Sequence, residues 1–191
     1  MTGVVGLLLA AGAGRRMGRP KALVESPDGT PWVVTASGVL RDGGCDEVVV
    51  VLGAEYDRVR ALLEAPLTVV EAADWETGMG ASLRAGLDEV AGRDGAGRDA
   101  ESVLVHLVDL PDVGPDVVRR VASASAPDVL ARATYRDGPG HPVLIGREHW
   151  AGVAATATGD RGARDYLRGR HVLAVDCSDL AGGADVDRPT L

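Results

Sequence analysis

The sequence contains no phenylalanine, and it has only three tryptophans and three tyrosines among 191 residues. An aromatic core is therefore excluded, and the interior must be built from valine, leucine and alanine. Hydrophobic residues make up 46% of the chain, which is enough for one well-buried core at this length. Because valine favours strands, this composition predicts a sheet-rich interior in a single domain that spans residues 1–191.

Positive charge is also scarce, since the chain has 20 lysines and arginines against 28 aspartates and glutamates, and its net charge is −8. Nucleic acids and anionic membranes attract positively charged proteins, so we expect this chain to bind neither. No apolar run is long enough to cross a bilayer, and no basic leader precedes the first apolar stretch. The two cysteines, Cys45 and Cys177, lack metal-ligand spacing, which predicts a reduced, cytoplasmic protein.

The chain does contain a regular alternation of apolar runs and amphipathic stretches. Continuous runs of valine and leucine predict strands that are covered on both faces. The predicted strands are Val4–Leu9, Glu47–Leu52, Leu67–Glu71, Ser102–Val108, Val129–Tyr135, Val143–Ile145 and Val172–Val175. The predicted helices are Trp32–Arg41, Glu55–Leu63, Gly80–Val90, Pro115–Ser125, Arg147–Ala154 and Ala163–Arg168. This alternation predicts an α/β fold with three layers and a mostly parallel, doubly wound, Rossmann-like sheet.

Ligands of such sheets bind beyond the carboxyl ends of the strands. That rule selects four segments for inspection, namely Ala10–Lys21, Gly53–Glu55, Ala72–Ser82 and Asp109–Asp112. One other segment, Gly92–Glu101, is rich in glycine and charge, and it predicts a flexible surface loop.

The segment Leu9–Lys21 follows the first predicted strand directly and reads LAAGAGRRMGRPK. Its glycines Gly12, Gly14 and Gly18 allow the backbone to approach a ligand closely, and successive N–H groups can bind an anion. No Gly-Lys-Ser/Thr follows, so the segment is not a Walker loop. The spacing G-x-G-x-x-x-G also differs from the dinucleotide fingerprint G-x-G-x-x-G, which disfavours a dinucleotide site.

The same segment concentrates positive charge. The first forty residues contain four cationic side chains, and all of them lie here: Arg15, Arg16, Arg19 and Lys21. Lys21 is the only lysine of the chain. A compact ammonium group is suited to a phosphate oxygen, although a surface lysine retained by chance is the alternative. A local positive patch in an acidic protein indicates a small anionic ligand.

Here the sequence resembles a known family. The pattern L-A-A-G-x-G-x-R-M-G-x-P-K in this segment is similar to the signature of the MobA-like nucleotidyltransferases, which include molybdenum cofactor guanylyl- and cytidylyltransferases and sugar-phosphate nucleotidyltransferases. Three later stretches resemble the cytidylyltransferase branch: residues 78–87, 138–143 and 159–164. A fourth, residues 185–189, lacks that branch's usual acidic tail, and Gly80 replaces its usual serine.

The resemblance implies the nucleotide-diphospho-sugar transferase version of the fold and a Mg²⁺-dependent transfer of CMP from CTP to molybdopterin, a phosphorylated pterin, with release of pyrophosphate. A molybdoenzyme or its chaperone would receive the product. Arg16 and Lys21 would be catalytic. The nucleotide would contact Leu9, Ala10, Ala11, Gly12, Gly14, Arg15, Ser82 and Asp109. The acceptor would contact Gly140, His141, Asp160 and Arg161, and the metal ligands would be Asp109 and Asp185.

Simpler roles stay open for several of these residues. Asp109 ends an apolar strand, which suits a Mg²⁺ ligand, but with Pro111 it could also cap a turn. Ser82 could cap a helix instead of contacting the base. His141 could simply be exposed, and Asp187 could replace Asp185 as the ligand. Asp160 and Arg161 could cap and pair at a helix start.

Other functions also remain open. GTP could replace CTP, or a sugar phosphate could be the acceptor, without a change of fold. From another class, an NAD(P)H-dependent oxidoreductase is possible, since some chains similar to this branch are described as oxidoreductases. A non-catalytic nucleotide sensor is disfavoured because Lys21 and Asp109 are both present.

Overall fold

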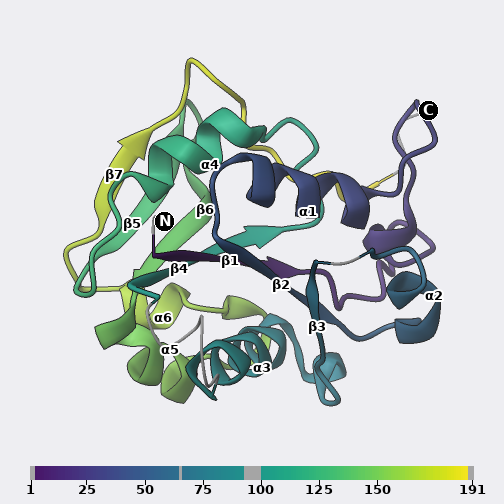
Figure 1. Cartoon of the computed structure of the whole chain (residues 1–191), viewed down its shortest axis with the longest axis horizontal. Coiled ribbons are helices and arrows are strands. Elements are labelled where there is room, and N and C mark those ends of the chain that lie inside the picture. Colours follow the sequence, from purple (N-terminus) through teal and green to yellow (C-terminus); the bar gives the residue numbers. More distant parts are fainter. Residues whose placement is uncertain (1–2, 65, 93–99, 189–191) are drawn as a thin grey trace.

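The computed structural model describes residues 3–64, 66–92 and 100–188. A seven-stranded sheet forms the centre of the molecule, with the strand order β3-β2-β1-β4-β6-β5-β7 (Figure 1). The strands are β1 (Val4–Leu9), β2 (Glu47–Leu52), β3 (Thr68–Glu71), β4 (Ser102–Leu107), β5 (Leu130–Tyr135), β6 (Gly138–Gly146) and β7 (Leu173–Asp176). All seven overlap the strands predicted from the sequence.

The sheet is mostly parallel, as predicted. β1 pairs in parallel with β2 and β4, β2 with β3, and β5 with β7. Only β6 runs antiparallel, to both β4 and β5. Two residues, Arg136 and Asp137, join β5 to β6, and so short a connection can link only antiparallel strands. The sequence analysis predicted β6 only over Val143–Ile145 because Gly and Pro interrupt its first half.

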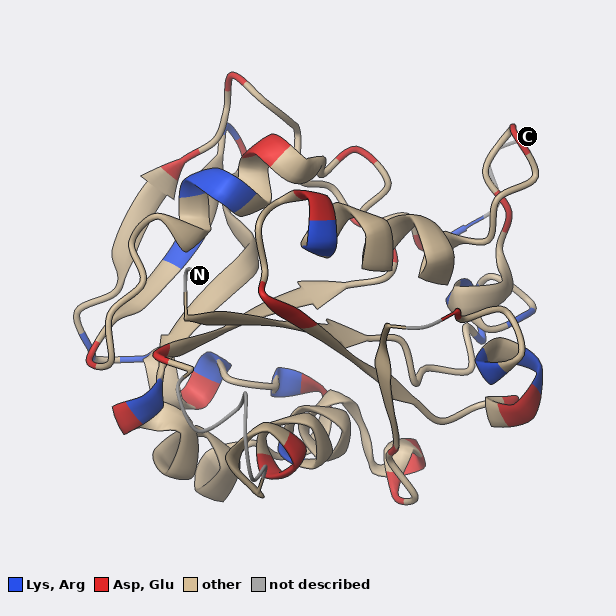
Figure 2. Cartoon of the chain, viewed as in Figure 1, with Lys and Arg blue, Asp and Glu red and all other residues tan. Residues whose placement is uncertain are grey.

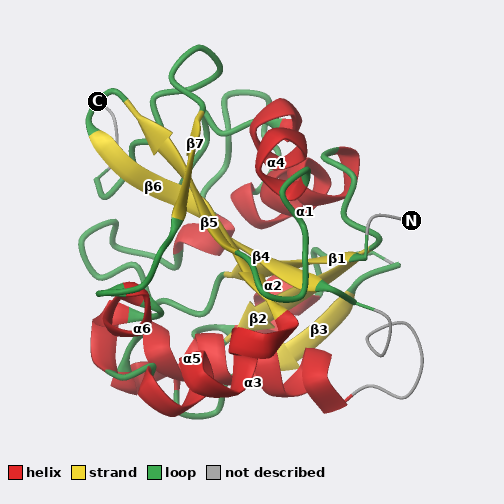
Figure 3. Cartoon of the chain, turned by 90° about the vertical axis from the view of Figure 1, so that its left-hand side faces the viewer, coloured by secondary structure: helices red, strands yellow, loops and turns green. Residues whose placement is uncertain are grey.

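Helices cover both faces of the sheet (Figure 3). They are α1 (Trp32–Asp42), α2 (Tyr56–Arg60), α3 (Met79–Gly92), α4 (Pro115–Ala122), α5 (Trp150–Thr156) and α6 (Arg164–Leu167). The buried side chains of α1 and α4 pack in one hydrophobic cluster, and those of α3, α5 and α6 pack in a second cluster across the sheet. The β1 sequence VVGLLL is buried at every position because both faces are covered. The predicted three-layer arrangement is therefore confirmed.

Several helix bounds differ from the prediction. The helix predicted over Glu55–Leu63 spans only Tyr56–Arg60, and Glu55 has a left-handed φ of 52° that cannot continue a helix. The segment Arg147–His149 is a 3-10 turn that precedes α5. Further 3-10 turns at Lys21–Leu23, Trp75–Thr77 and Gly159–Arg161 were not predicted, because three residues carry no periodicity. Most of the predicted loop Gly92–Glu101 lies outside the described residues; Gly92 itself ends α3.

Charged residues lie on the helices, the loops and the strand ends, and the inner strands are almost free of them (Figure 2). Among the described residues, no helix has the length and apolarity that crossing a membrane requires. The interior is instead a Val- and Leu-rich core, as the composition predicted.

One polar side chain inside this core has a nitrogen without a partner. His106 of β4 is buried, and its Nδ1 has no hydrogen-bond partner among the described residues. Burial lowers the pKa of His106 to about 3, with a further contribution from His141. The folded protein therefore keeps this imidazole neutral, whereas the unfolded chain binds a proton near its ordinary pKa of about 6.5.

We expect the free energy of unfolding to fall as the pH drops from about 6.5 toward 4, because the unfolded state then binds more protons than the folded state. Each unit of difference in pKa corresponds to about 1.4 kcal/mol. His106→Leu should make this pH dependence shallower and leave stability near neutral pH unchanged or higher. Urea unfolding at about pH 7.5 and pH 5 measures both effects. An unchanged slope in the variant would show that His106 titrates normally.

Candidate active site

A cavity of about 510 Å³ opens beyond the carboxyl ends of β1 and β4. The chain leaves β1 toward α1 on one face of the sheet, whereas α3 precedes β4 on the other face, so this is a topological switch point. The loop after β1, the end of β4 and the start of α3 supply most of the lining. The sequence analysis selected these three segments from the strand pattern alone.

Gly14, in the loop after β1, is constrained both by its backbone conformation and by its surroundings. Gly14 has a φ of 60°, and a Cβ there would lie 1.9 Å from the carbonyl oxygen of Arg19. The carbonyl of Gly14 also accepts a hydrogen bond from the N–H of Met17 at 2.8 Å, which turns the loop back on itself. Gly12 differs, because a Cβ at that position would meet nothing within 4 Å.

We therefore expect Gly14→Ala to lower thermal stability and to abolish ligand binding in the cavity, because the backbone must shift to remove the clash. Gly12→Ala is the matched control in the same loop, and it should leave the melting temperature of the ligand-free protein within about 2 °C of wild type, as a surface change would. Differential scanning calorimetry of both variants tests this. Equal melting temperatures would contradict the proposed constraint at Gly14.

The inner wall of the cavity is backbone held to the sheet. The N–H of Ala10 donates to the carbonyl of Val51, and the N–H of Ala54 donates to the carbonyl of Ala11, both at 2.9 Å. This fixes Leu9, Ala10 and Ala11 along one side of the cavity, as expected for a rigid pocket floor.

The opposite wall comes from the segment before and within α3. Ser82 lines the cavity, but it lies inside the first turn of α3, which begins at Met79, so the helix-capping role considered for Ser82 is wrong. Trp75 also lines the cavity, and its ring packs against Gly53, where a Cβ would come within 2.4 Å of it. The cavity is therefore lined by backbone on one wall and by polar and apolar side chains on the other.

A charged cluster lies at the mouth of the cavity. Lys21 donates from its Nζ to Asp109 at 2.6 Å and to Asp187 at 2.7 Å, and Arg16 also pairs with Asp187. Burial lowers the pKa of Lys21, but the hydrogen bonds and charges of the two carboxylates outweigh it, so the pKa is raised above 10.5. The bond from Lys21 lowers the pKa of Asp187. Lys21 and Asp187 are therefore both ionised at neutral pH.

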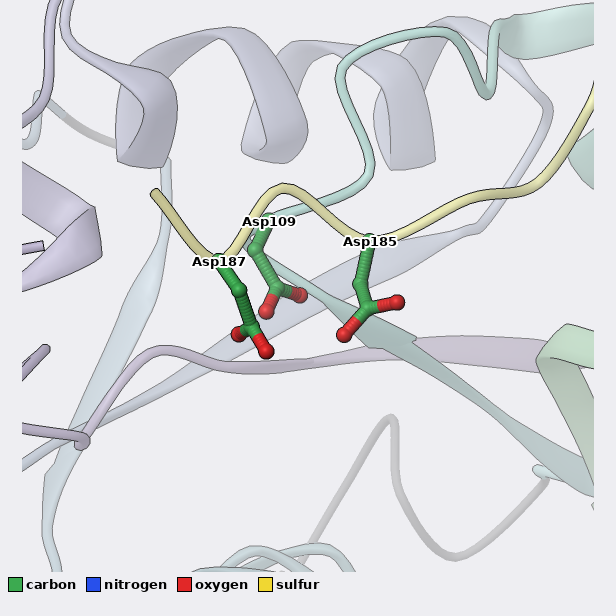
Figure 4. Close-up of side chains that lie close together, drawn as sticks. All are labelled: Asp109, Asp185 and Asp187. Carbon is green, nitrogen blue, oxygen red and sulfur yellow. The ribbon is translucent and has the colours of Figure 1, made fainter. Parts of the chain in front are cut away.

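Asp109, Asp185 and Asp187 bring carboxylate oxygens within 4.8 Å of one another. Figure 4 shows that Asp109 comes from the segment after β4 and the other two from the C-terminal segment, and that the three side chains point the same way. Hard divalent cations bind to clustered carboxylate oxygens, so these residues fit such an ion. The sequence analysis preferred Asp185 over Asp187, whereas the structure brings both to Asp109.

The C-terminal segment is held in place by contacts that the sequence analysis missed. The N–H of Val186 donates to the carbonyl of Asp109 at 3.0 Å. Asp112 accepts hydrogen bonds from the N–H groups of Gly182 and Gly183 at 2.8 and 3.0 Å. The sequence analysis included Asp112 only as the end of the selected segment Asp109–Asp112. Its position three residues after Asp109 was the one available signal.

The residues expected at the acceptor side are spread more widely. Asp160 lines the cavity, but Arg161 pairs with Asp165 at 3.1 Å and is not among the lining residues. Gly140 and His141 lie in the first half of β6, where the Tyr135 hydroxyl donates to the His141 carbonyl at 2.6 Å. Burial lowers the pKa of His141 to about 4, so its imidazole is neutral near pH 7. The structure thus places Asp160 and Arg161 in the 3-10 turn Gly159–Arg161, and it places Gly140 and His141 in β6.

Comparison with known proteins shows which family this sequence and fold match. The model of the MobA-like NTP transferase domain matches residues 6–175. A nicotine blue oxidoreductase of Paenarthrobacter nicotinovorans is 42% identical over 96% of this chain and 92% of its own length. A molybdenum cofactor guanylyltransferase of Rhodobacter capsulatus is 32% identical over 77% of this chain and 65% of its own length. The solved structure of Rv0371c from Mycobacterium tuberculosis in complex with manganese is 29% identical, with a TM-score of 0.72 over 96% of this chain and 93% of that one.

Proposed function

This chain belongs to the MobA-like NTP transferase family, and we propose that it transfers the cytidylyl group of CTP to molybdopterin with release of pyrophosphate. One observation carries the proposal. Lys21 and three carboxylates lie together at the mouth of a cavity that is lined by a glycine-rich loop. This arrangement suits a triphosphate with its cation, because the loop offers N–H groups and the cluster offers both charge and metal ligands.

The residues have separate tasks in this reaction. Backbone N–H groups around Gly12 and Gly14 hold phosphate oxygens, while Lys21 and Arg16 neutralise the charge that gathers as the acceptor approaches. Mg²⁺ held by Asp109 and its two neighbouring carboxylates would supply further positive charge to those oxygens. The manganese bound in the related M. tuberculosis structure supports a divalent ion here.

The chemical step is a displacement at the α-phosphorus. An oxygen of the acceptor's phosphate forms a bond to the α-phosphorus of CTP, and the bond from that phosphorus to the bridging oxygen breaks. Pyrophosphate leaves with the bonding electrons. A phosphate oxygen is already ionised near pH 7, so the protein need not remove a proton. Positioning and charge neutralisation are therefore the main contributions of the chain.

The choice of CTP rests on the stretch Gly78–Leu87. It resembles the cytidylyltransferase branch, and its residues Gly78, Met79 and Ser82 line the cavity. GTP is the competing nucleotide, because a guanylyltransferase is among the relatives. An NAD(P)H-dependent oxidoreductase is the second candidate, and the 42% identical relative named nicotine blue oxidoreductase favours it. Lys21 between two carboxylates argues for the transferase, since hydride transfer needs no such cluster.

Ligand-dependent thermal stabilisation separates these candidates. The purified protein is heated with CTP, GTP, ATP, UTP, NADH or NADPH, each with and without Mg²⁺. A ligand at about a hundred times its dissociation constant adds about 2.7 kcal/mol of stability. Mg²⁺-enhanced stabilisation by CTP alone is expected, followed by pyrophosphate release when molybdopterin is added. Stabilisation by GTP would identify GTP instead of CTP as the nucleotide substrate. Stabilisation only by NADH or NADPH would overturn the proposal.

A further inference from the structure

A second group of basic side chains lies outside the triphosphate cavity. Arg132 belongs to β5, where Leu130 packs with α3, α5 and α6 and the intervening Ala131 packs with α1 and α4. By strand alternation, the side chain of Arg132 lies on the α3–α5–α6 face. Its Nε is buried and has no hydrogen-bond partner within residues 3–64, 66–92 and 100–188, and its Nη2 makes one long contact of 3.4 Å with the Gly140 carbonyl.

Arg164 begins α6 on the same face of the sheet. Burial lowers the pKa of Arg132, and the charge of Arg164 lowers it further, so the two guanidinium groups repel each other. No ion pair joins either arginine to an acidic residue in the described part of the chain. Two neighbouring guanidinium groups that share no carboxylate lack a negative charge to compensate their own.

His141 connects this pair to the carboxylate cluster. Burial, then Arg132 and Arg164, lower the pKa of His141, whereas Asp185 raises it. Its imidazole is therefore within electrostatic reach of both arginines and of Asp185. The neutral ring adds a hydrogen-bonding group without a third positive charge. The lining of the triphosphate cavity, among the residues described, includes neither arginine.

We propose that Arg132 and Arg164, assisted by His141, bind the phosphate group of the acceptor and hold its attacking oxygen beside the carboxylate cluster; this rests on the proposed nucleotidyl transfer. Guanidinium groups match phosphate oxygens in geometry and charge. A phosphate monoester carries nearly two negative charges near neutral pH, which two arginines can neutralise. Because His141 interacts electrostatically with this pair and with Asp185, a phosphate bound here would lie outside the triphosphate cavity and still be near the carboxylate cluster.

A binding experiment tests the proposal without turnover. The protein is first saturated with Mg²⁺ and α,β-methylene CTP, which occupies the triphosphate cavity. Phenyl phosphate, as the probe for a phosphate monoester, is then titrated by isothermal calorimetry. We expect binding to the wild type and a loss of at least about tenfold in affinity in Arg164→Gln and in Arg132→Gln, as for lost hydrogen bonds to a charged group. Arg41→Gln is the control, because Arg41 is exposed on α1 and pairs with its neighbour Asp42.

The outcomes separate this proposal from the proposed function. Equal affinity in wild type and Arg164→Gln, or no binding to the wild type, would overturn the phosphate site. Arg164 is exposed, so its variant should fold even if Arg132→Gln does not. Binding that depends on both arginines in a protein without cytidylyl transfer would retain the site and reject the proposed reaction.

Steady-state kinetics give a second readout. In an active enzyme, both variants should raise the KM for the acceptor by at least about tenfold with little change in the KM for CTP. An equal rise in both KM values would mean that the arginines bind the nucleotide instead, which contradicts the assignment.

Discussion

Lys21→Ala should lower the turnover of nucleotidyl transfer by about a hundredfold or more, which corresponds to about 2.7 kcal/mol of activation free energy. The ammonium group lies between Asp109 and Asp187 at 2.6 and 2.7 Å, and it is the one lysine of the sequence. Its loss leaves three carboxylates and a triphosphate with much less positive charge. Single-turnover measurements at saturating CTP isolate this effect from binding.

Two controls define the role of Lys21. Lys21→Arg keeps the charge, but its broad guanidinium group must fit a gap shaped for an ammonium, so we expect only partial activity. Arg58→Ala removes an exposed cation of α2 that pairs with Glu55, and it should leave turnover unchanged. Near-normal turnover in Lys21→Ala, with an intact melting temperature, would remove Lys21 from the mechanism.

Asp109→Asn should abolish activity together with its dependence on Mg²⁺. The substitution keeps the shape of the side chain but removes the charge that pairs with Lys21 and faces Asp185 and Asp187. Hard divalent cations bind an amide oxygen much more weakly than a carboxylate within such a cluster. A magnesium titration of CTP-dependent stabilisation and of pyrophosphate release measures both consequences.

The neighbouring carboxylates provide a graded comparison. Asp185→Asn should weaken metal dependence without disturbing Lys21, because within the described residues Lys21 bonds to Asp109 and Asp187 and not to Asp185. Asp187→Asn, by contrast, also removes the pairs with Lys21 and Arg16. An unchanged magnesium titration in Asp109→Asn would place the metal elsewhere.

The fold was largely predictable from the sequence because its elements are long and strongly patterned. Runs such as VVGLLL and EVVVVL become central strands buried on both faces. The errors concern short or special backbone, where no periodicity exists. Glu55 adopts a left-handed conformation, and Gly and Pro at residues 138–140 still form the first half of β6.

The position of the candidate site was predictable where its residues follow directly from a strand. The loop after β1 and Asp109 after β4 were found because ligands lie beyond the carboxyl ends of parallel strands. The contribution of Asp187 and the anchoring role of Asp112 depend on how the C-terminal segment passes the carboxyl end of β4. Arg132 was missed because a single cation within a strand gives no local signal. Such tertiary placements cannot be inferred from local patterns.

The C-terminal segment separates the requirements of the fold from those of the candidate site. Asp185 and Asp187 follow every helix and strand in chain order. A chain truncated after Gly183 would therefore keep all seven strands and the loop that carries Lys21, but it would lose two of the three clustered carboxylates. Such a chain would separate folding from metal binding, because the core and the carboxylate cluster depend on different parts of the sequence.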